Sequence, residues 1–87
     1  MDTPITPSWF ATPDGTTLYA LTGPDRLVEH QRIGRRYRMQ VLEVKTYADR
    51  LHVASLLERV EAGWLVRMEA EEYAEAVRNI ETLEPLP

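Results

Sequence analysis

The chain contains no cysteine. This absence excludes disulfide bonds, thiolate metal sites and thiol nucleophiles, and it fits a reducing, cytoplasmic setting. No apolar run approaches the roughly 20 residues that a membrane-spanning helix needs, so we expect no membrane partner. Residues 1–25 carry no basic side chain, which argues against a secretory signal. We therefore expect a cytoplasmic protein.

Glycine and histidine are also scarce. The chain has four glycines, which are Gly15, Gly23, Gly34 and Gly63. They are too widely spaced for the glycine-rich loops that hold nucleotide phosphates. The two histidines, His30 and His52, lie far apart in the sequence, and no thiol is present to complete a four-ligand metal site. We expect neither a metal site nor a cofactor.

The size and composition fit one small domain. The chain has 87 residues, of which 44% are hydrophobic, enough for one core but not for two. Its net charge of -4 at pH 7 argues against a dedicated nucleic-acid-binding domain, because such domains are usually basic. We expect a proline-rich N-terminal arm over residues 1–15 and a single domain over residues 16–87.

Charge is segregated along the chain. Residues 1–25 carry three acidic side chains, and residues 26–50 carry seven basic and three acidic ones, a net charge of +4. Residues 51–87 carry eight glutamates and three arginines, a net charge of -5. A basic segment between acidic ones can bind a polyanion, dock an acidic partner or neutralise the chain's own tail.

The N-terminal arm holds two adjacent aromatic residues. Prolines interrupt residues 1–15 and argue against a regular helix or a central strand there. Trp9 and Phe10 lie between these prolines. They can anchor the arm to the core of the domain, or they can insert into a partner as an aromatic hook.

The next segments predict strands. Residues 16–21 form a short strand candidate, and residues 36–46 alternate between apolar and polar side chains with the period of a strand. The alternation changes phase between Val41 and Leu42, where consecutive residues are both apolar. Such a change of phase predicts a bulge or a sharp bend at that point.

The sequence of residues 47–62 is compatible with either a helix or strands. Val53, Leu56, Leu57 and Val60 follow helical spacing. A helix here would have to reach a strand beginning at Trp64 through a single residue, whereas such connections usually take about two to six. A hairpin with glycine in its turn meets no such difficulty. Periodicity favours a helix and connectivity favours strands, and on balance we expect strands.

The C-terminal part predicts a strand over residues 64–68 and a helix over residues 70–83. The helix has an apolar stripe at three- and four-residue spacing: Tyr73, Ala76, Val77, Ile80 and Leu83. Glutamates dominate its first turns and Arg78 comes late, which complements the helix dipole. Prolines follow it.

Together these elements predict an α+β fold: a small, strongly bent antiparallel sheet or a partly open barrel with one C-terminal amphipathic helix. The succession of a strand, a long loop, a bent strand, hairpins around Gly63 and Trp64 and a late helix is similar in layout to SH3-like barrels. The similarity concerns layout alone, because no segment carries a motif of that family.

One set of residues has the composition of a catalytic triad. Asp49, His52 and Ser55 stand three apart, so on a helix they would be neighbours. The spacing fails on a strand, and no glycine-rich turn follows the serine to supply oxyanion-stabilising N–H groups. We therefore assign no catalytic residues and expect that the protein is not an enzyme.

The basic segment holds the strongest binding signal, and its four clustered arginines are Arg32, Arg35, Arg36 and Arg38. Arginine makes bidentate contacts with phosphates and carboxylates, and an aromatic neighbour on the same side can stack on a base. Tyr37, however, points to the opposite side of a strand from Arg36 and Arg38, so we expect it in the core. The acidic C-terminal helix, in the same or a second copy, competes for these arginines.

These observations predict a small non-enzymatic protein-binding or regulatory module that acts through protein–protein contacts and self-associates. Its partner is another protein or a second copy of the chain. The expected contact residues are Trp9, Phe10, Arg32, Arg35, Arg36 and Arg38. The alternative is a weak RNA- or DNA-binding module that uses the basic cluster from Arg32 to Arg38.

Overall fold

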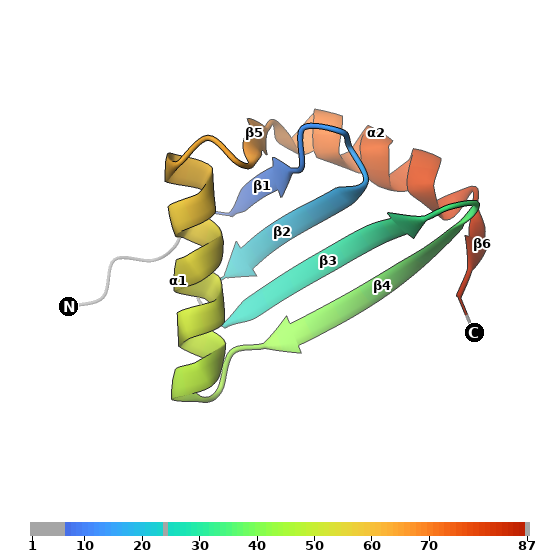
Figure 1. Ribbon diagram of the computed structural model, residues 1–87. Helices are drawn as coiled ribbons and strands as arrows, with labels where there is room; N and C mark the ends of the chain where they lie inside the picture. The colour runs from blue at the N-terminus through green and yellow to red at the C-terminus, as the bar shows by residue number, and fades with distance from the viewer. Residues whose placement is uncertain (1–6, 24, 87) are drawn as a thin grey trace.

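The computed structural model describes residues 7–23 and 25–86. Six strands of that part form one sheet: β1 (Ser8–Ala11), β2 (Thr17–Gly23), β3 (Arg26–Ile33), β4 (Arg36–Glu43), β5 (Val66–Met68) and β6 (Glu84–Pro85). Two helices accompany them, α1 (Tyr47–Glu61) and α2 (Ala70–Glu81). The strand order is β5-β1-β2-β3-β4-β6, and neighbours are antiparallel except for the parallel pair β4 and β6 (Figure 1). The chain therefore has a small α+β fold.

The sheet is open, because it ends in two separate edge strands, β5 and β6 (Figure 1). It does not close into a barrel, and the strong bend and SH3-like layout expected from the sequence are not confirmed. The sheet is also mixed rather than purely antiparallel, and the described part has two helices where the sequence predicted one.

The two helices pack on opposite sides of the sheet. On the α1 side, the helix covers a core that includes Phe10, Leu21 and Leu27. On the α2 side, the helix packs against Ala11 and Leu18. Figure 1 shows α1 crossing the end of the sheet where β3 begins, and α2 lying towards the end where β3 finishes. Helix α1 therefore covers one side of the sheet at the end where β3 begins, and α2 covers the opposite side towards the end where β3 finishes.

This diagonal arrangement explains the change of phase in β4, and the predicted bulge there is wrong. The pairing of β3 with β4 runs without a shift from Arg26 opposite Glu43 to Ile33 opposite Arg36. Tyr37 packs under α2 on one side, whereas Leu42 packs under α1 on the other. A strand with an unbroken register can thus change the side on which its apolar residues lie where the covering helix changes. The one register shift between β2 and β3 lies between Leu21 and Gly23.

Residues 47–61 are helical, so the expectation of strands there was wrong. Thr46 caps the helix, and it forms a reciprocal capping box with Asp49. The connectivity argument failed because β5 begins at Val66 rather than at Trp64. Residues 62–65 then connect α1 to β5, which is an ordinary length. Gly63 supplies the positive φ of 82° that this turn requires.

The N-terminal segment also differs from its prediction. Ser8–Ala11 is not an arm but an interior strand, because β1 pairs with both β2 and β5. Pro7 and Pro13 flank this strand without entering it, so neither proline removes an N–H group from the ladder. Residues 1–6, the rest of the expected arm, lie outside the described part.

The C-terminal helix is confirmed as α2, although it ends at Glu81 and Leu83 lies beyond it. Its apolar stripe packs on the sheet through Tyr73, Ala76, Val77 and Ile80. Within residues 7–23 and 25–86, neither helix is both long and apolar enough to cross a membrane.

Candidate functional site

The two aromatic residues predicted as contacts point to opposite sides of β1. Phe10 is 0% exposed in the core under α1, and the Arg67 guanidinium lies 5.5 Å from the centroid of its ring. Trp9 is half-buried on the α2 side, with its ring centroid 6.4 Å from that of Tyr73. Phe10 therefore presents no surface to a partner, whereas Trp9 keeps part of its surface exposed.

The four arginines predicted as contacts are exposed, but they do not share one side of the sheet. Arg36 and Arg38 lie on the α1 side, Arg32 lies on the α2 side opposite Tyr37, and Arg35 lies in the turn between β3 and β4. Tyr37 packs under α2, as its position in the alternation predicted. Tyr37 therefore does not share a side of the sheet with Arg36 and Arg38.

Hydrogen bonds hold two of these arginines locally. The Nε of Arg32 donates to the carbonyl oxygen of Gly34 at 3.1 Å, and an Nη of Arg38 donates to Oε1 of Gln31 at 2.8 Å. Among the described residues, none of the four forms an ion pair with a carboxylate. The pairing of these four arginines with the acidic helix of the same molecule is therefore not observed in the described part of the chain.

The outer edge of β4 is open over most of its length. Strand β6 pairs only with Arg36 and Tyr37, at one end of β4 (Figure 1). In the part of the chain that the structure describes, no strand pairs with the outer edge of residues 38–43. An unpaired edge presents a row of N–H and C=O groups on which another strand can form.

The hydrogen bonds at both ends of β4 identify the residues that face outward. The carbonyl oxygen of Tyr37 accepts from the N–H of Leu86, away from β3, whereas the N–H of Val44 donates to Asp25 on the β3 side. In an antiparallel strand the direction alternates from residue to residue. The backbone groups of Met39, Val41 and Glu43 therefore point outward. Their even-numbered neighbours bond to β3.

The side chains of this edge add apolar surface. Met39 is 51% exposed and Val41 is 44% exposed, both on the α2 side of the sheet and beyond the cover of α2. Val41 lies at the end of a row across the strands that continues through Val28 and Ala20 to Trp9. We call residues 38–43, with this exposed apolar surface, the β4 edge.

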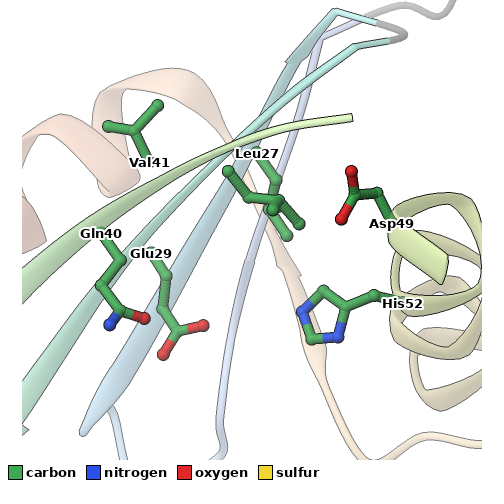
Figure 2. Close-up of a pocket in the computed structure, with 7 residues that line it drawn as sticks. Leu27, Glu29, Gln40, Val41, Asp49 and His52 are labelled. Carbon is green, nitrogen blue, oxygen red and sulfur yellow. The ribbon is translucent and has the colours of Figure 1, made fainter. Parts of the chain in front are cut away.

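A groove lies on the other side of the sheet, beside α1 (Figure 2). Its volume is about 510 Å³, and its polar lining comes from Glu29, Gln40, Asp49 and His52. Figure 2 shows Asp49 and His52 reaching from the helix towards Leu27. The groove thus combines a histidine with carboxylates, which is the composition that acid–base chemistry uses.

The Asp49 carboxylate is occupied by the helix cap. Its Oδ2 accepts hydrogen bonds from the backbone N–H groups of Lys45 and Thr46, each at 3.0 Å. The hydrogen bond from Lys45, followed by that from Thr46, holds the pKa of Asp49 below its usual value. The carboxylate is therefore ionised and holds the start of α1, a structural role.

The described residues around this groove form neither the Asp49, His52 and Ser55 triad nor a metal-ligand cluster. Ser55 lines a separate depression with Arg59 and Trp64, so it does not join Asp49 and His52 as a triad. Within residues 7–23 and 25–86, no three histidine or carboxylate side chains come together as metal ligands.

The sequence predictions missed the β4 edge. The alternation of residues 36–41 predicted a strand, but it did not show which edge of that strand lacks a neighbour. That property depends on where β6 lies in the sheet, and Glu84–Pro85 has no strand signal of its own. Comparisons of the chain with family models, curated proteins and solved structures find no match.

Proposed function

We propose that this chain is a small protein-binding or regulatory module that acts through protein–protein contacts along the β4 edge. The observation that carries the proposal is the open edge itself, with its outward backbone groups at Met39, Val41 and Glu43. Adding a strand to such an edge is a common mode of protein recognition, in which backbone hydrogen bonds supply affinity and alternate side chains supply specificity.

The surroundings of the edge support a protein as its partner. Met39 and Val41 expose apolar side chains next to the outward N–H and C=O groups, so pairing would bury apolar surface as well as satisfy hydrogen bonds. Arg36 and Arg38 lie on the other side of the same strand, and Arg35 lies in the turn beside it. These charges add orientation and a faster encounter with an acidic surface.

Two of the predicted contacts have a smaller part in this proposal, and one has none. Trp9 belongs to the far end of the apolar row that begins at Val41. Arg32 lies on the α2 side beside Tyr37 and widens the basic surface there. Phe10 is left out because it is wholly buried. A cytoplasmic setting is part of the proposal, since the chain has no disulfide to form.

Site-specific photo-cross-linking in cells tests the proposal. A photoreactive phenylalanine analogue is placed at Met39, and at Glu75 as an exposed control position on α2. We expect protein adducts at position 39 and none at position 75. In a second protein that also carries Val41→Lys, the adduct should be lost, because a charge on the edge opposes pairing.

Equal adducts at both positions, or an adduct at position 39 that Val41→Lys does not change, would contradict a contact through the β4 edge. The absence of any protein adduct would contradict the proposed function as a whole.

Weak RNA or DNA binding is the second candidate. It is favoured by Arg36 and Arg38, which lie exposed on the same side of the sheet beside the amide side chains of Gln31 and Gln40. It is opposed by the position of Tyr37 on the other side, since binders of single strands usually stack bases on exposed aromatic rings. We rank it below the protein-binding function for that reason.

A further inference from the structure

We infer that the partner of the β4 edge is a second copy of this chain, paired antiparallel so that the two sheets become one continuous sheet across a two-fold axis at Val41. The inference rests on the protein-contact function proposed above. A two-fold dimer places the same surface of each copy against the other, so the edge must be complementary to itself.

The backbone of the β4 edge meets this requirement. With Val41 opposite Val41 of the second copy, Met39 of each copy lies opposite Glu43 of the other. All of these residues have outward N–H and C=O groups. Each opposed pair exchanges two hydrogen bonds, so the register forms about six of them and uses every outward group of residues 38–43.

Neighbouring two-fold registers use the edge less well. An axis at Gln40 would oppose Tyr37 and Glu43, but the carbonyl oxygen of Tyr37 already accepts from Leu86 at 2.8 Å. An axis at Leu42 would place Met39 opposite residue 45, beyond the end of β4 at Glu43. The position of β6 on one side and the end of the strand on the other therefore select the axis at Val41.

The side chains are compatible with this register. On the α1 side, Arg38 lies opposite Val44 and Gln40 lies opposite Leu42 of the second copy. On the α2 side, the two Val41 side chains meet, and β-branched residues pair well across strands. No like charges are directly opposed.

The ends of the strands add no charge repulsion in this register. Arg36 and Arg38 lie on the α1 side, whereas Glu43 lies on the α2 side, opposite Met39 of the second copy. The Nζ atom of Lys45 lies 3.0 Å from Oε2 of Glu43, so the charge at this end of the strand is paired within each copy.

The dimer should be weak. A six-residue edge falls short of the roughly 800 Å² per partner that specific complexes bury. We therefore expect a dissociation constant in the micromolar range or above, so that the population of the dimer depends on protein concentration.

Sedimentation of variants with opposite charges at Val41 tests the inference. As the concentration of the full chain rises, the mass measured by sedimentation should increase from 10.0 kDa to about twice that value. Val41→Lys and Val41→Glu each oppose like charges across the axis, and each should raise the dissociation constant at least about tenfold. An equimolar mixture of the two variants should restore a dimer of one copy of each. Val66→Lys, at an exposed position of β5, is the matched control and should dimerise normally.

Amide hydrogen exchange reports the register. Exchange at Met39, Val41 and Glu43 should slow as protein concentration rises, whereas exchange at Gln40 and Leu42, already bonded to β3, should not change. A chain that stays monomeric at millimolar concentration, or dimers of Val41→Lys as tight as those of the natural chain, would overturn the inference. If the chain is monomeric but position 39 still cross-links to another protein in a manner that Val41→Lys abolishes, the inference fails and the proposed function stands. If both experiments fail, both proposals fail.

Discussion

The Nε2 atom of His30 lies 3.9 Å from Oε1 of Glu81, so the last residue of α2 faces a histidine in the middle of β3. His30 is 4% exposed, and in the described part of the chain its Nδ1 has no hydrogen-bond partner. Burial lowers the pKa of His30 below 6.5, while the nearby Glu81 carboxylate acts in the opposite direction. The interface between α2 and the sheet therefore holds a neutral imidazole that resists protonation.

This histidine should make the free energy of unfolding depend on pH. Because the pKa of His30 is lower in the folded than in the unfolded chain, the unfolded chain binds more protons just below pH 6.5. Stability should thus be lost as the pH falls through about 6.5, well above the range in which carboxylates titrate. Thermal unfolding followed between about pH 8 and about pH 5 measures this slope.

Two variants should change this slope in opposite directions. His30→Leu removes the titrating group and should flatten the slope. Glu81→Gln removes the charge that raises the pKa of His30, and the loss of stability should extend to lower pH. His52→Gln, at the other histidine, is the control. An unchanged slope in His30→Leu would contradict this origin of the pH dependence.

The packing of α1 can be tested with two leucines of the same helix. Leu56 is 3% exposed in the core beneath α1, whereas Leu51 is 52% exposed. Leu56→Ala should lower the free energy of unfolding by about 2 to 5 kcal/mol, because it leaves a cavity. Leu51→Ala should change it by less than about 0.5 kcal/mol. Chemical denaturation measures both, and similar costs at the two positions would contradict the orientation of α1.

The strengths and failures of the sequence-based prediction of the fold have one physical origin. The stripe of α2 was visible because Ala76, Val77 and Ile80 face a single surface. The change of phase between Val41 and Leu42 was misread as a bulge because it was assumed that one side of the sheet carries the core. Here each side carries part of the core at a different end. A local pattern does not contain that tertiary information.

The candidate site was predictable only in part. The alternation of residues 36–41 placed Tyr37 correctly on the opposite side from Arg36 and Arg38. The sequence of residues 1–15 did not distinguish Trp9 from the wholly buried Phe10. Adjacent residues of an interior strand are exposed or buried according to what covers each side of the sheet. The open β4 edge depends on a two-residue strand near the C-terminus, which has too few residues to show a period.

A salt series on nucleic acid distinguishes the two candidate functions. If Arg32, Arg35, Arg36 and Arg38 all contacted phosphates of a single strand, the logarithm of the binding constant would fall with that of the salt concentration with a slope of about -3. We expect no saturable binding of single-stranded RNA at about 50 mM salt, because Tyr37, the aromatic residue between Arg36 and Arg38, packs under α2 on the other side of the sheet. Saturable binding that the combined Arg35→Ala, Arg36→Ala and Arg38→Ala variant abolishes would support the nucleic-acid function instead.

Proline substitutions test the direction of the backbone groups in β4. Val41 directs its N–H outward, so Val41→Pro should keep the β3–β4 ladder intact and lower the free energy of unfolding by no more than about 1 kcal/mol. Gln40 directs its N–H towards β3, so Gln40→Pro removes a ladder hydrogen bond and should lower the free energy of unfolding more than Val41→Pro does. Chemical denaturation compares two adjacent, exposed positions that differ in this direction. A larger loss at Val41 than at Gln40 would reverse the assignment of the outward residues, and the β4 edge would then present a different set of donors and acceptors.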